Sequence, residues 1–263
     1  MLAVARRDPT VRSPPKVNEN IFLLVPNLIG YARIALALVS LHFMPLHPRR
    51  CTFLYSASCL LDALDGYAAR KFDQSSQFGA VLDMVTDRCT TACLLVFLAM
   101  AMPGYALMWQ GLISLDFASH YMHMYATLAT SGKGGGSHKN VSAGRSRTLN
   151  FYYKKWVLFT VCFMNEAFFV ALYLTCFSAP ADGSLGVGAA ERFSAAAMER
   201  ARAGKIDDEW PWVVVRVMAP GMMFKQFVNV LQLVKASQWL AEGDRRERRK
   251  AKLNWTTAHR DQV

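Results

Sequence analysis

Four aspartates stand out because they lie inside an otherwise apolar part of the chain. Asp62 and Asp65 are three positions apart, and Asp83 and Asp87 are four positions apart. On a helix, either spacing puts both carboxylates of a pair on one face. Neighbouring carboxylates repel each other unless a cation lies between them. An ionisable group among apolar residues is also costly, so these aspartates are candidates for a functional site.

The chemistry that such carboxylates support is the binding of a hard cation. The segment between the pairs, 73–77, is only a short link, so the helices that carry them must be antiparallel neighbours. Four carboxylates can then surround one or two ions. Oxygen ligands without cysteine or histidine indicate Mg²⁺ or Mn²⁺ rather than zinc. We therefore predict a metal site between these two helices.

The residues around the aspartates suit a ligand that carries phosphate. Gly66 and Gly79 have no side chain, so a nucleotide or another backbone segment can approach closely. Ala69 lies one turn from Gly66 and keeps the same face thin. Arg70 offers paired donors to phosphate oxygens, and Ser76 adds a hydroxyl in the turn. The pattern predicts a pyrophosphate ligand beside the metal.

Together these residues spell D-x2-D-G-x2-A-R-x8-G-x3-D-x3-D from Asp62 to Asp87. This segment resembles the motif of the CDP-alcohol phosphotransferase family at every fixed position. The surrounding stretches LLDALDGYAARKF and FGAVLDMVTDRCTT are most similar to the eukaryotic members that use inositol, as are the later stretches SHYMH, SHK and YYKKWVLFTVCFMNEAFF. The resemblance extends over residues 20–240.

The resemblance implies a role for each motif residue. Asp62, Asp65 and Asp83 would be metal ligands, and Asp87 would be both a ligand and the general base. The CDP-lipid would be bound by Gly66, Ala69, Arg70, Ser76 and Gly79. An inositol hydroxyl would attack the β-phosphorus of CDP-diacylglycerol, and CMP would leave. The resemblance also implies a homodimer in the endoplasmic reticulum membrane, with the site open to the cytosol.

Candidates for binding the acceptor alcohol lie further along the chain. Asp116, Ser119 and His120 follow helical spacing on one face, which favours a cavity lining, although an ordinary interfacial role would give the same pattern. His138 and Lys139 lie in a glycine- and serine-rich loop, where the charge could instead serve topology. In the first apolar helix, Asn27 and Arg33 are further candidates for cavity lining.

The composition indicates an all-α integral membrane protein. Of 263 residues, 53% are hydrophobic and only 19% are charged, and the hydrophobic residues form long runs. Six of these runs approach the roughly 20 residues that cross a bilayer. We therefore predict six transmembrane helices at 22–44, 51–72, 78–102, 105–129, 151–178 and 211–241.

The charge distribution predicts how these helices are oriented. The net charge is +11, and the lysines and arginines gather beside the ends of the apolar runs. Their bias favours both termini, and the turn between the second and third helices, on the cytosolic side. We divide the chain into a polar cytosolic segment, 1–20, a six-helix domain, 21–241, and a basic cytosolic tail, 242–263. The sequence has no basic face interleaved with aromatic residues, the pattern that would indicate nucleic-acid binding. We therefore expect membrane lipids, and not nucleic acid, as partners.

Three alternatives remain open at this stage. The same family includes enzymes with other acceptors, such as glycerol 3-phosphate, and the motif defines only the donor half of the reaction. Intramembrane acids also occur in divalent-cation transporters, but a transporter does not explain Gly66, Gly79 and Arg70. Finally, the aspartates could be structural carboxylates paired with arginine, but two basic partners, Arg70 and Arg88, cannot balance four acids.

Overall fold

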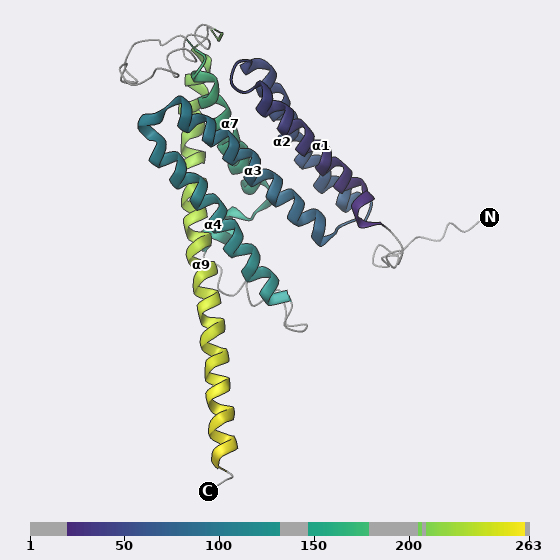
Figure 1. Cartoon of the computed structure of the whole chain (residues 1–263), viewed down its shortest axis with the longest axis vertical. Helices are drawn as coiled ribbons and strands as arrows, with labels where there is room; N and C mark the ends of the chain where they lie inside the picture. The colour runs from purple at the N-terminus through teal and green to yellow at the C-terminus, as the bar shows by residue number, and fades with distance from the viewer. Residues whose placement is uncertain (1–19, 132–146, 179–204, 207–208, 261–263) are drawn as a thin grey trace, which may run out of the picture.

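The chain forms a bundle of long helices (Figure 1). The computed structural model describes residues 20–131, 147–178, 205–206 and 209–260. The long helices of these residues are α1 (Val25–Phe43), α2 (Pro48–Lys71), α3 (Gln77–Ala101), α4 (Ala106–Ser131), α7 (Lys155–Thr175) and α9 (Trp210–Arg260). The shorter ones are η1 (Ile21–Leu23), η2 (Pro103–Tyr105) and α6 (Arg147–Tyr152). Within these ranges there is no strand, only an isolated bridge between Ser178 and Ile206.

The all-α prediction is confirmed, and the predicted membrane character is supported in part. Three helices, α1, α3 and α7, are long and apolar enough to cross a membrane. The helices α2, α4 and α9 occupy the other predicted ranges but do not meet the same measure of length and hydropathy within the described residues. Six membrane spans therefore remain a prediction.

Local sequence signals explain where the first three helices begin. Proline is tolerated in the first turn of a helix, where its missing N–H would have no partner. Pro26 occupies the first turn of α1 and Pro48 that of α2. Leu24, which precedes Pro26, is extended and separates η1 from α1. At α3, the Ser76 hydroxyl caps the helix by accepting a hydrogen bond from the Gly79 N–H at 2.9 Å.

The turn between α2 and α3 is tied to the start of α1. Asp73 adopts a left-handed backbone conformation, with φ 55°, which aspartate tolerates better than most residues. The next residue, Gln74, accepts a hydrogen bond from the Val25 N–H at 3.1 Å. The turn, α1 and α2 are therefore held together at the end of the bundle that carries the motif.

Two predicted helices differ from the observed ones. The predicted helix 151–178 is interrupted, because α6 ends at Tyr152 and Lys154 is extended before α7 begins. The side chain of Tyr153, at this break, lies 3.3 Å from His123 Nε2 on α4 and accepts a hydrogen bond from Gln232 on α9 at 2.8 Å. These contacts to two other helices hold the chain in a turn that an apolar pattern alone does not predict.

The predicted sixth helix, 211–241, is much longer than expected. α9 continues through the basic segment to Arg260, so residue 242 marks a change in composition and not the end of a helix. Figure 1 shows this C-terminal part of α9 extending alone beyond the other helices. Its side chains from Asp244 to Thr256 are exposed, which is the environment that its charges favour.

A smaller apolar cluster joins α6, α7 and α9 around Leu149 and Val228, and the main apolar core lies at the end of the bundle away from the motif. There the ring of Phe97 on α3 packs edge-on against Tyr173 and stacks with Phe177, with ring centroids 5.1 and 6.1 Å apart. The buried Tyr173 hydroxyl donates to the backbone carbonyl of Met44, in the turn between α1 and α2, at 2.8 Å. Ring packing and this hydrogen bond thus hold α1, α3 and α7 together at one end, and the aspartates lie at the opposite end.

A glycine permits the close contact between α7 and α9. A Cβ atom on Gly221 would lie 2.5 Å from the Cβ of Met164, which is shorter than any ordinary contact. The Gly221→Ala substitution should therefore force the two helices apart and cost about 1–3 kcal/mol of stability. We expect a lower midpoint of thermal unfolding in detergent.

Gly243 provides a matched control in the same helix, because a Cβ there would meet nothing within 4 Å. Gly243→Ala should leave the midpoint unchanged or raise it, since alanine favours helix by about 1 kcal/mol over glycine. Equal midpoints for both variants would show that the α7–α9 contact does not depend on Gly221.

Candidate metal and nucleotide site

Three of the four motif aspartates form a cluster with the geometry of a metal site. Carboxylate oxygens of Asp62 on α2 and of Asp83 and Asp87 on α3 lie within 4.8 Å of one another. The short turn between α2 and α3 brings the two pairs together, but the prediction that α2 and α3 are direct neighbours is wrong, because α1 packs against both of them and they hardly touch each other. Asp65 is not part of this group of three. Its carboxylate contacts Arg33, as those of the other three aspartates also do.

Arg33 on α1 contacts all four aspartates. Its Nη1 lies 2.6 Å from an oxygen of Asp65 and 2.6 Å from one of Asp83. Its Nη2 lies 2.8 Å from an oxygen of Asp62 and 2.5 Å from one of Asp87. Only 1% of Arg33 is exposed. The guanidinium therefore joins α1, α2 and α3 at a single buried point.

The sequence indicated Arg70 and Arg88 as the basic partners of the aspartates. The structure shows that Arg33 lies at the centre of the four carboxylates. Arg88 contributes one longer contact, 3.4 Å from Asp87 Oδ2. The signal that could have identified Arg33 is a lone arginine inside the apolar run 25–43, because such a charge needs a partner.

The donor set fits a divalent metal ion. Four carboxylates face two guanidinium groups, so negative charge remains in excess when all are ionised. The clustered atoms of Asp62, Asp83 and Asp87 are all carboxylate oxygens, which suit a hard cation. These three residues could hold a divalent ion. Arg33 contacts the same three, so it and a metal ion would compete for their oxygens.

A cavity of about 200 Å³ adjoins the aspartates between α1, α2 and α3. Asp65 and Asp83 form part of its wall. All five residues predicted to bind the CDP-lipid also line it, namely Gly66, Ala69, Arg70, Ser76 and Gly79. These five residues come from α2, from α3 and from the turn between them, and α1 closes the cavity with residues such as Asn27.

The structure gives a more specific reason for Gly79. A Cβ atom there would lie 2.6 Å from Oδ1 of Asn27, so the close approach is by a side chain of α1. Asn27 is buried and lines the same cavity, as proposed from the sequence. Gly66 faces the guanidinium of Arg70, whose Nη1 would lie 3.4 Å from a Cβ on Gly66. Arg70 therefore folds back over Gly66 at the cavity wall.

Of the predicted acceptor residues, Asp116 and His120 contact Arg88, which in turn contacts Asp87. Nη1 of Arg88 donates to Asp116 Oδ1 at 3.2 Å and lies 2.9 Å from Nε2 of His120. Ser119 is completely buried, and its hydroxyl donates to the Asp116 backbone carbonyl within α4. His138 and Lys139 lie outside the described residues.

Another carboxylate near the aspartates, that of Glu166 on α7, accepts hydrogen bonds from neutral donors. It accepts hydrogen bonds from the Tyr55 hydroxyl at 2.9 Å, from Asn165 at 3.2 Å and from Thr91 at 3.3 Å. Asn165 in turn accepts one from Gln226 on α9 at 3.1 Å. Polar contacts therefore run from α2 and α3 through α7 to α9, and the sequence pattern alone did not show which helices Glu166 joins.

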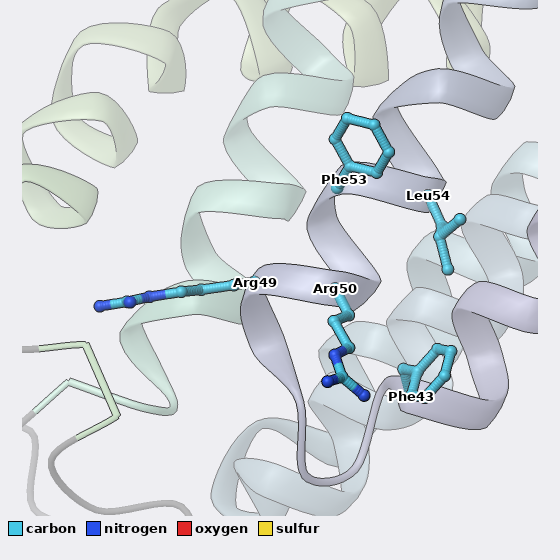
Figure 2. Close-up of a pocket in the computed structure, with 5 residues that line it drawn as sticks. All are labelled: Phe43, Arg49, Arg50, Phe53 and Leu54. Carbon is cyan, nitrogen blue, oxygen red and sulfur yellow. The ribbon is translucent and has the colours of Figure 1, made fainter.

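Another cavity, of about 350 Å³, lies at the turn between α1 and α2, near the opposite end of α2 from the motif. Figure 2 shows its lining, Phe43, Arg49, Arg50, Phe53 and Leu54. The guanidinium of Arg50 lies beside the Phe43 ring, 5.7 Å from its centroid, whereas Arg49 points away from both (Figure 2). No aspartate lines this cavity, so the predicted chemistry belongs to the site between α1, α2 and α3.

Comparison with known proteins identifies the family. The family model for CDP-alcohol phosphatidyltransferase matches residues 23–181, more than half of the chain, including the whole aspartate motif. The chain belongs to the CDP-alcohol phosphatidyltransferase family. No solved structure matches it.

Several curated relatives resemble nearly the whole chain. A Schizosaccharomyces pombe protein is 47% identical over 236 residues, covering 89% of this chain and 96% of the relative. A Saccharomyces cerevisiae protein is 44% identical over 234 residues, covering 88% and 93%. A Homo sapiens protein is 42% identical over 237 residues, covering 89% and 99%. Each is named CDP-diacylglycerol–inositol 3-phosphatidyltransferase.

The position of Arg33 leads to a prediction about metal binding. Arg33→Gln removes the buried partner of four carboxylates, which typically costs about 3–5 kcal/mol in the metal-free protein. We expect a lower midpoint of thermal unfolding in EDTA and a larger rise on adding Mn²⁺ than in the unmutated protein. A Mn²⁺ titration should also give tighter binding, because the ion no longer competes with the guanidinium.

Arg49→Gln, at the turn far from the aspartates, is the matched control and should leave the Mn²⁺ response unchanged. Weaker Mn²⁺ binding in Arg33→Gln would show that Arg33 supports the metal site and does not compete with the ion.

Proposed function

We propose that this protein transfers the phosphatidyl group of CDP-diacylglycerol to myo-inositol and releases CMP. Relatives named CDP-diacylglycerol–inositol 3-phosphatidyltransferase cover most of the chain at 42–47% identity. The observation that carries the proposal is the cavity beside the aspartates, because all five residues predicted to bind the CDP-lipid line it. Substrate binding and carboxylate chemistry would therefore occur at one place.

The cavity residues would bind and orient the nucleotide end of the donor lipid. Gly66 and Ala69 leave its wall thin, and Arg70 would donate to phosphate oxygens. Ser76 and Asn27 add polar groups to the same wall. The metal ligands would be Asp62, Asp65, Asp83 and Asp87, and bound Mg²⁺ or Mn²⁺ would neutralise negative charge on the pyrophosphate oxygens.

Asp87 is the proposed general base. One of its oxygens faces Arg33 and the other faces Arg88, at 2.5 and 3.4 Å, so its carboxylate is oriented by two guanidinium groups. Asp87 would take the proton from an inositol hydroxyl while that oxygen attacks the β-phosphorus. The bond between this phosphorus and the CMP oxygen would then break, so CMP leaves with the electron pair.

Inositol would approach from the helices beyond Arg88. Asp116 and His120 on α4 contact Arg88 directly, which supports their assignment as acceptor-binding residues. Ser119 would act only by supporting α4, because its hydroxyl is buried against the backbone. His138 and Lys139 are proposed for the same role from the sequence.

We further propose six membrane spans in the endoplasmic reticulum, with both termini and the metal site facing the cytosol, and a homodimeric assembly. The basic residues beside the motif turn support the orientation, since Arg70 and Lys71 end α2 where the aspartates lie. A cytosolic site would also suit inositol and CMP, which are both soluble in water. Localisation and assembly follow from the resemblance to eukaryotic members of the family.

The proposed reaction is tested by CMP release from CDP-diacylglycerol. Purified protein with Mg²⁺ or Mn²⁺ should release CMP when given inositol, and much less with glycerol 3-phosphate, serine or choline. Greater release with glycerol 3-phosphate would assign the chain to another acceptor within the same family. Asp87→Asn should lower turnover about 10²–10⁴-fold, the usual contribution of a general base. If that variant kept half of the activity, Asp87 would not be the base.

The membrane orientation is tested with single cysteines in a background that lacks the native six. Lys71→Cys ends α2 beside the motif, and Gly104→Cys lies after α3, so one span separates them. Both positions are exposed. In sealed vesicles with the cytosolic face outward, an impermeant maleimide should label only Lys71→Cys. Labelling of both from one side would show that α3 does not cross the membrane.

A further inference from the structure

Arg88 and a group of charged and polar side chains around it lie beside the four motif aspartates, on the side that faces α4 and α9. We name Arg88, Asp116, His120, Lys225 and Asn229 the acceptor cluster. They come from α3, α4 and α9, whereas the cavity beside the motif is formed by α1, α2 and α3. Arg88 links the two places, because its Nη2 lies 3.4 Å from Asp87 and its Nη1 lies 3.2 Å from Asp116.

The contacts of His120 define its tautomer. Arginine can only donate, so Nε2 of His120 accepts from Arg88 at 2.9 Å. Nδ1 then carries the hydrogen and donates to the backbone carbonyl of Asp116 at 2.8 Å. His120 is therefore a neutral member of the cluster, and its ring is oriented from both sides.

Lys225 supplies a second buried cation. Only 4% of it is exposed, and its Nζ donates to Asn229 Oδ1 at 3.0 Å and lies 5.8 Å from the centre of the Tyr152 ring. Asn229 in turn donates to Asp116 Oδ1 at 3.3 Å. Two cations, Arg88 and Lys225, thus depend on the same carboxylate, one directly and one through an amide.

The charges in this part of the bundle balance. Two carboxylates face Arg88, Asp116 at 3.2 Å and Asp87 at 3.4 Å, and Asp116 also reaches Lys225 through Asn229. Among the described residues of the cluster, neither Arg88 nor Lys225 is left without polar contacts. Together with Asp87, the group therefore offers hydrogen-bond donors and acceptors without an excess of positive charge.

We propose that Asp116 selects an uncharged acceptor by neutralising Arg88. This inference rests on the proposed function and adds the property by which the site distinguishes acceptors. A polyol needs donors and acceptors of both kinds, which the cluster provides. A phosphorylated acceptor carries about 1.5–2 negative charges at neutral pH. It would meet the Asp116 carboxylate and find no unpaired cation in the cluster to bind it, so it would be disfavoured.

Asp116→Asn tests the proposal, because the amide keeps the shape of the side chain and removes only its charge. The assay compares CMP release with inositol and with inositol monophosphate. The substitution would remove one of the two carboxylates that face Arg88 and leave only Asp87, so the ratio of kcat/KM for inositol over the monophosphate should fall about tenfold or more. Loss of a merely structural contact would lower both values together and leave the ratio unchanged, which would overturn the proposal.

Asp244→Asn is the matched control, since it makes the same charge change on the exposed part of α9. Its ratio should equal that of the unmutated protein. If Asp116→Asn releases no CMP with either acceptor, thermal unfolding decides the question. The monophosphate should then raise the midpoint of the variant more than inositol does, and the reverse order would overturn the proposal.

The proposed function is judged separately, by release of CMP from the unmutated protein with inositol. Failure of that assay would remove the inositol assignment. The thermal comparison of inositol with its monophosphate would still report whether Asp116 sets the charge preference of the cluster.

Discussion

The repulsion among four aspartates in an apolar bundle is the constraint on which the rest of the structure depends. Asp62, Asp65, Asp83 and Asp87 can approach one another only if positive charge lies between them. Arg33 supplies it, with contacts of 2.5–2.8 Å to all four. The same contacts join α1, α2 and α3, so the requirement for charge compensation also determines how three helices pack.

The opposite end of the bundle supports this arrangement in a different way. Phe97, Tyr173 and Phe177 pack together near the turn between α1 and α2. Apolar burial there is favourable and does not depend on direction. It holds α3 and α7 in place, and the charged end can then keep its carboxylates close without having to stabilise the bundle alone.

Arg88 divides the charged end into two environments. On one side, the cavity between α1, α2 and α3 contains the glycines and Arg70, which suit a pyrophosphate. On the other, Asp116 and His120 face Arg88 from α4, and α9 adds Lys225 and Asn229. A transfer reaction needs two substrates to meet at one phosphorus atom, and Asp87 lies between these two environments.

The aspartate motif could be predicted from the sequence, because the spacing of aspartates along a helix and the short link at 73–77 are local properties. The closeness of the two aspartate pairs followed from them, whereas the all-α class followed from the long apolar runs and the residues around the cavity from the motif and its family resemblance. Helix packing was needed to show that Arg33 is the central cation, that Asn27 faces Gly79, and that Glu166 contacts Tyr55 and Thr91. These contacts join residues far apart in the chain, so they depend on how the helices pack, which no periodic pattern along one helix records.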